Sequence, residues 1–155
     1  MITDTKFFIT EALFKLLKTN NLKDIKITNI VKLSNISRTT FYNNFKNIKE
    51  IIDYKFNLII EDLYITYNLN KLRKNNKITL IKNILKYINN NKENFLVIKN
   101  KLFFEFKNSL DNYFIKKTNN KYEYYILSGI IINITIYYLE NNDSIENIIK
   151  NIKIN

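Results

Sequence analysis

The side chains best suited to chemistry lie in one stretch of the chain, residues 27–52. Threonine, serine and asparagine side chains gather there around Arg38 and several lysines. Such groups suit hydrogen bonds to base edges and contacts with phosphates. The order of apolar and polar residues predicts two short helices separated by a tight turn, a helix-turn-helix over about residues 28–47.

Local signals define the ends of these two helices. Thr28 is a favourable N-cap and predicts the start of the first helix. Asn35 occupies the turn position that needs a left-handed backbone, which asparagine tolerates better than most residues other than glycine. Ser37 is predicted to cap the second helix, which runs to about Asn44.

Longer helices must position this motif. An apolar face of helical spacing predicts a preceding helix from about Asp4 to Thr19. Asn47, with Glu50 three residues later, forms an asparagine variant of the capping box that opens a long helix to about Asn68. Further helices are predicted over residues 78–88, 94–101, 102–117, 121–140 and 144–152. Because no run of strict two-residue alternation is present, the sequence predicts an all-α fold of about nine helices.

The charge of the chain favours a polyanionic partner. The 155 residues carry a formal net charge of +11, and the pI is about 9.6. The first 50 residues hold nine basic and four acidic side chains, against 16 and 10 in the rest. Nucleic acid is therefore the first expectation and an anionic membrane the second.

Several functions are disfavoured by residues that the chain lacks. It has no cysteine and no histidine, and Gly129 is its single glycine. Disulfides, thiolate metal sites, the usual general base and a glycine-rich phosphate loop are thus missing, so we expect no catalytic residues, metal site or cofactor. The longest apolar-rich run, Ile126–Leu139, is too short to span a membrane, and no signal peptide is recognisable. A cytoplasmic setting without membrane contact is expected.

Residues 5–55 resemble the N-terminal domain of the TetR/AcrR transcriptional regulators. The resemblance rests on Ile27-Thr28-x-Ile30, on Ser37-Arg38-x-Thr40-Phe41-Tyr42-x-x-Phe45-Lys46-Asn47 and on Lys49-Glu50-Ile51-Ile52. It implies a three-helix DNA-binding unit that leads through a long fourth helix into a ligand and dimer domain.

The second helix of the motif is too short to be stable alone, so we expect Ile36, Phe41 and Phe45 to anchor it. Arg38 can then make a bidentate contact to guanine, and Thr39 can contact a thymine methyl. The side chains expected to face outward are Ser37, Arg38, Thr39, Thr40 and Asn43.

Contacts with the DNA backbone are expected around this helix. Thr28 lies at a helix N-terminus, where a hydroxyl and free amides suit a phosphate. The resemblance places Tyr42 and Asn43 near the backbone and Lys46 beside a phosphate. Departures from the family pattern bear on DNA affinity rather than on the fold, and Lys49 is expected to replace the family lysine missing at Ile48. The departures are Asn35 for glycine, Asn43 for tyrosine, Asn44 for histidine and Ile48 for lysine.

The resemblance divides the chain into a DNA-binding domain, residues 1–60, and a helical domain, residues 61–155. The second domain looks like that of small TetR-like regulators, among them regulators of dihydroxyacetone kinase operons. It implies a homodimer on double-stranded DNA, most often a repressor, with the helices over 102–117 and 121–140 at the dimer interface. Gly129 would suit a close approach of helices there.

Aromatic side chains in the second domain have two readings. They can line a pocket for a small apolar or aromatic effector, or they can be ordinary core and interface residues. The candidates are Phe95, Phe103, Phe104, Tyr113, Tyr124 and Tyr125. An alternative function is a TetR-like co-regulator whose second domain binds a partner protein instead of a small molecule.

Overall fold

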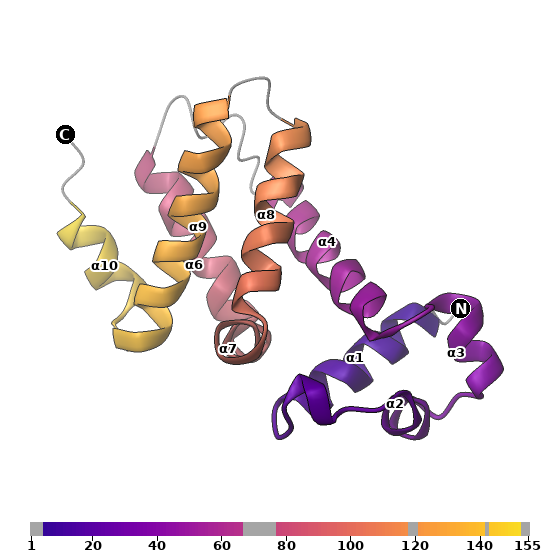
Figure 1. Ribbon diagram of the computed structural model, residues 1–155. Helices are drawn as coiled ribbons and strands as arrows, with labels where there is room; N and C mark the ends of the chain where they lie inside the picture. Colours follow the sequence, from indigo (N-terminus) through magenta and orange to yellow (C-terminus); the bar gives the residue numbers. More distant parts are fainter. Residues whose placement is uncertain (1–4, 67–76, 118–120, 142, 153–155) are drawn as a thin grey trace. The chain divides into compact units, whose positions relative to one another are not determined.

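The computed structural model describes residues 5–66, 77–117, 121–141 and 143–152, and these are helical apart from short connections (Figure 1). Within these ranges the all-α prediction is confirmed, with nine α-helices, one 3₁₀ helix and no strand. The elements are α1 (Thr5–Leu17), the 3₁₀ helix η1 (Leu22–Asp24), α2 (Ile27–Ser34), α3 (Arg38–Asn44), α4 (Ile48–Thr66), α6 (Lys77–Asn90), α7 (Lys92–Lys101), α8 (Phe103–Lys117), α9 (Lys121–Asn141) and α10 (Ile145–Asn151).

The chain forms two compact units, Met1–Phe56 and Asn57–Asn155. The division falls inside α4, four residues before the boundary expected between residues 60 and 61. Among the described helices, none combines the length and apolar content that crossing a membrane requires.

The first unit is built on α1, which packs against α2 and α3 (Figure 1). Its apolar face buries Ile9, Leu13 and Leu17 at four-residue spacing. From the helix-turn-helix, Phe41 is fully buried and Phe45 nearly so, which confirms them as anchors of α3. Ile36, the third expected anchor, is only half-buried. Two aromatic side chains therefore attach the short α3 to the core.

The turn and the start of α4 follow the local signals. Asn35 has φ 54° and ψ 45°, the left-handed conformation expected there. Asn47 Oδ1 accepts a hydrogen bond from the Glu50 N–H at 3.0 Å, as the capping box predicts. The return bond differs from that motif, because the Glu50 carboxylate accepts from the Lys46 N–H at 2.7 Å instead of from the N-cap residue.

The predicted cap of α2 is wrong. The helix begins at Ile27, with Lys26 as its N-cap residue, so Thr28 lies inside the first turn. The Asn29 side chain reaches back and accepts from the Lys26 N–H at 2.9 Å. This bond satisfies the N–H of the N-cap residue, which lies two positions before Thr28. The 3₁₀ helix before α2 was not foreseen either.

The second unit is a bundle in which α9 packs against α6, α7 and α8, and α10 against α6. Its core contains Phe95, whose ring lies edge-on to Phe106 with centroids 5.9 Å apart. The buried Ser128 hydroxyl on α9 donates to the Asp111 carboxylate on α8 at 2.6 Å. Lys107 pairs with the other oxygen of this carboxylate at 2.7 Å. The α8–α9 contact thus includes a satisfied polar pair within an apolar interface.

We expect Asn35→Ala to lower the free energy of unfolding by about 1 kcal/mol, because a side chain without Asn's local hydrogen bonds is strained in the left-handed region. Asn35→Gly is the matched control and should be close to neutral, since glycine adopts this conformation without a steric penalty. Urea unfolding followed by far-ultraviolet circular dichroism measures both. Equal losses in the two variants would contradict the role assigned to the backbone conformation.

Candidate nucleic-acid interface

The N-terminus of α3 is organised by two hydroxyl groups. Ser37 Oγ accepts a hydrogen bond from the Thr40 N–H at 2.9 Å, which confirms Ser37 as the N-cap. The same oxygen lies 2.8 Å from Thr40 Oγ1. Ser37 and Thr40 thus hold the first turn together, and their hydroxyls are already engaged with one another.

The exposed residues of α3 divide into two faces. Thr39 and Asn43 lie four residues apart and on the side opposite the buried Phe41, because two residues turn a helix by about 200°. Arg38 and Tyr42 form a second exposed pair at the same spacing. Tyr42 packs edge-on against Phe41, with ring centroids 5.4 Å apart, and stays about half exposed.

An open depression of about 820 Å³ lies beside the Arg38–Tyr42 face. Residues from three helices meet there, namely the first turn of α2, α3 and the first turn of α4. Of the sequence-predicted DNA contacts, the depression brings together Thr28, Arg38, Tyr42 and Lys49. The complete lining is Ile25, Lys26, Ile27, Thr28, Arg38, Tyr42, Asn47, Ile48 and Lys49.

The depression is suited to an anion. Lys26, Arg38 and Lys49 contribute positive charge, and none of the nine lining residues is acidic. Helix N-termini carry free N–H groups and a partial positive charge, and two of them, those of α2 and α4, meet here. Lys49 is held by Asp53 at 2.6 Å, but its side chain is 79% exposed. An exposed pair of this kind contributes little, so Lys49 is able to exchange Asp53 for a phosphate.

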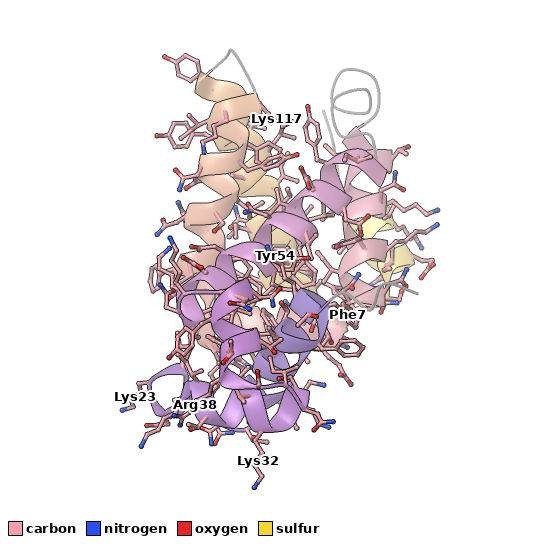
Figure 2. The ribbon with its side chains drawn as sticks, turned by 90° about the vertical axis from the view of Figure 1, so that its right-hand side faces the viewer. Phe7, Lys23, Lys32, Arg38, Tyr54 and Lys117 are labelled. Atoms are coloured by element: carbon pink, nitrogen blue, oxygen red, sulfur yellow. The ribbon has the colours of Figure 1, made fainter. Side chains whose placement is uncertain are left out.

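The other predicted contacts lie outside the depression. Ser37, Thr39, Thr40 and Asn43 belong to the start and outward face of α3, and Lys46 is exposed just after it. In Figure 2 the side chains of Lys23, Lys32 and Arg38 project from the same end of this unit. The polar surface around α3 is therefore wider than the depression itself.

Two polar lining residues were not among the contacts predicted from the sequence. Lys26 was not considered because Thr28 was taken as the cap, although a lysine directly before a helix N-terminus is a visible signal. Asn47 was considered only as a cap, and in the structure it also lines the depression.

The aromatic effector candidates do not share one environment. Phe95 is in the core, with its ring 6.1 Å from that of Tyr87. Phe103 is half-buried, whereas Phe104 beside it is 74% exposed.

Tyr113 and Tyr125 differ in the same way. Tyr113 is half-buried against Tyr64, and burial raises the pKa of its phenol, with Glu61 and Tyr64 acting in the same direction. Tyr125 is 55% exposed on α9. The remaining candidate, the side chain of Tyr124, lies outside the described residues. Within the described part of the chain, no cluster of three or more acidic, histidine or cysteine residues stands ready to hold a metal ion.

Comparison with solved structures finds a protein of similar fold, the dihydroxyacetone kinase operon activator DhaS. The two structures have a TM-score of 0.59 at 22% sequence identity, and the match covers 95% of this chain and 90% of that one. This likeness concerns the fold. No family model matches the sequence, and a search of curated proteins finds no match.

Loss of the α3 cap should be measurable without DNA. We expect Ser37→Ala to lower the free energy of unfolding by about 1 kcal/mol, because the Thr40 N–H loses its acceptor. Thr39→Ala, two residues on and exposed, should change it by less than about 0.5 kcal/mol. Chemical denaturation of both variants tests this, and a Thr39 effect as large as that of Ser37 would count against the cap.

Proposed function

We propose that this chain is a TetR-like transcriptional regulator that binds double-stranded DNA sequence-specifically. One observation carries the proposal, the convergence of Thr28, Arg38, Tyr42 and Lys49 from three helices on a basic depression beside α3 whose lining contains no acidic residue. In helix-turn-helix proteins the second helix of the motif presents its N-terminal residues to base edges, and neighbouring groups hold the backbone. The fold shared with a protein named as an operon activator supports this reading.

Within this proposal, contacts to base edges and contacts to the DNA backbone are made by different residues. Thr39 and Asn43, on the outward face of α3, meet base edges, and Arg38 reaches a guanine from the edge of the depression. The α2 and α4 N-termini hold phosphates. The side chains assigned to the DNA backbone are Lys26, Thr28, Tyr42, Lys46 and Lys49.

We further propose a homodimer on an inverted repeat. Two copies of α3 would occupy successive major grooves, with half-sites about 34–36 Å apart. The dimer would be formed by α8 and α9, and an apolar or aromatic effector in the second unit would change the spacing of the recognition helices by a population shift. The family resemblance favours repression. The similar structure is that of an operon activator, so transcription measured with and without the protein decides between repression and activation.

Selection of genomic DNA fragments by the purified protein tests the function itself. At near-physiological salt we expect enrichment of one short inverted repeat, because direct readout needs base contacts and a dimer reads two half-sites. Binding without any preferred sequence would overturn specific regulation and leave the +11 charge as the cause of binding.

The role of Arg38 can be tested on the selected repeat. Arg38→Ala should weaken specific binding by about 1–3 kcal/mol and relax the preference at one base pair of each half-site, while helicity stays unchanged. Lys15→Ala removes an exposed cation on α1 outside the depression and serves as control. An equal loss of affinity for all DNA sequences would show that Arg38 contacts the DNA backbone and not a base.

If Lys26 contacts a phosphate, its replacement should change affinity and salt dependence without changing sequence preference. Lys26→Gln should weaken binding to all sequences about equally and reduce the slope of log affinity against log salt by about 1, because one phosphate contact fewer releases fewer counterions. Lys107→Gln, a cation of the second unit, should leave the slope unchanged. Titrations at four or more salt concentrations measure it, and an unchanged slope for Lys26→Gln would exclude a phosphate contact.

A further inference from the structure

Helix α9 is apolar on two opposite faces. Its inner face, with Leu127, Ile131 and Tyr138, is buried, and the helix packs there against α6, α7 and α8. The outer face repeats at helical spacing through Tyr122, Tyr125, Ile126, Gly129, Ile130, Asn133, Ile136 and Tyr137. Tyr122 is 78% exposed and Ile126 59%. A helix that is apolar all round is normally covered on all sides, so this exposed outer face is suited to a partner beyond the protomer.

The outer face also lacks charge. From Tyr124 to Leu139 the helix has no charged residue, although the whole chain carries +11. Two copies of such a chain repel one another wherever charged surfaces meet, and an uncharged face permits their approach. The cores of protein interfaces are correspondingly depleted in charge and enriched in tyrosine.

Gly129 lies in the middle of this face. Glycine disfavours a helix relative to alanine, so its use here needs a cause. The described part of the protomer does not supply one, because a Cβ built at Gly129 meets none of its atoms within 4 Å. The open space lies where a second helix would have to approach the α9 backbone closely.

Helical spacing places residues four and seven positions before and after Gly129 on the same face of α9. Tyr122 and Ile136 lie seven residues before and after it, and Tyr125 and Asn133 lie four residues before and after it. When two identical helices cross antiparallel about a twofold axis, a residue before the crossing point meets the one equally far after it. Tyr125 of one copy then faces Asn133 of the other, a phenol opposite an amide.

We propose that α9 helices of two copies cross antiparallel at Gly129, which places the twofold axis of the dimer at this residue. The inference rests on the homodimer proposed above and assigns its point of closest approach. The outer face of α9 is thus occupied by a second copy of this chain, and neither an effector nor another protein is needed to cover it.

Single cysteines test the crossing point directly, since the chain contains none. A disulfide needs Cα atoms within about 7 Å, a separation that only residues at the axis reach with their own counterparts. Ile130→Cys, one position from the crossing, leaves Gly129 in place and should form at least tenfold more covalent dimer on mild oxidation than Tyr122→Cys, because residues seven positions from the crossing lie about 21 Å apart along the antiparallel helices. Ile78→Cys on α6 controls for random collision.

The mirrored pairing has its own test. A mixture of Tyr125→Cys and Asn133→Cys copies should cross-link at least tenfold better than either variant alone. If all positions along α9 cross-link equally with themselves, the helices are parallel and the proposal is wrong.

Gly129→Ala adds an independent measurement. In the isolated protomer the methyl group meets open space, so helix content should be retained or increased. Between two copies it blocks the close approach, and the dimer dissociation constant from sedimentation should rise at least tenfold. Ile78→Ala is the control. An unchanged constant overturns the crossing at Gly129.

These outcomes are separate from those of the DNA experiments. A protein that is dimeric and selects an inverted repeat, yet does not cross-link at residue 130, keeps the proposed function and loses this interface. A wild-type protein that stays monomeric at the concentrations where it binds DNA overturns the interface, as does one whose α9 face is covered only by a different protein. Failure of fragment selection with intact cross-linking at residue 130 overturns the function and keeps the interface.

Discussion

The burial of Phe41 and Phe45 is the contact on which the candidate DNA surface depends. Helix α3 has seven residues, too few to be stable in water by its own hydrogen bonds. Packing of two aromatic rings against the core therefore holds both its conformation and its direction. Because the two rings leave the helix on one side, Thr39 and Asn43 on the other side face solvent.

The same core orients the start of α4. Lys55 on α4 pairs with Glu11 on α1 at 2.8 Å, and its ammonium lies 5.4 Å from the centroid of the Phe14 ring. Closer to the N-terminus of α4, the rings of Phe45 and Tyr54 meet edge-on at 5.6 Å. These contacts bring the α4 N-terminus to the depression next to the α2 N-terminus. The basic character of this depression is thus a consequence of packing as well as of composition.

In the second unit, the aromatic side chains differ in how far they are buried. Its aromatic rings serve mainly as core, as Phe95 and Phe106 do, or lie exposed, as Phe104 and Tyr125 do. Composition alone favoured the reading as core and interface residues, because tyrosine and phenylalanine are common in both settings. The buried contact of Ser128 with Asp111 turns one face of α9 inward, and the apolar outer face follows from the helical period.

Some features of this protein were determined by the sequence alone, because they depend on neighbours three or four residues apart. The left-handed Asn35, the Ser37 cap and the Asn47–Glu50 bond are of this kind, and the helical periodicity predicted the all-α fold in the same way. Thr28 failed as a cap because two candidates compete within one turn, and the Asn29 side chain satisfies the earlier position. Only the tertiary structure decided that Lys26 joins Arg38 and Lys49 around one depression and that the aromatic candidates scatter. Those outcomes depend on the angles between helices distant in sequence, and these angles are fixed by packing against α1 and α9.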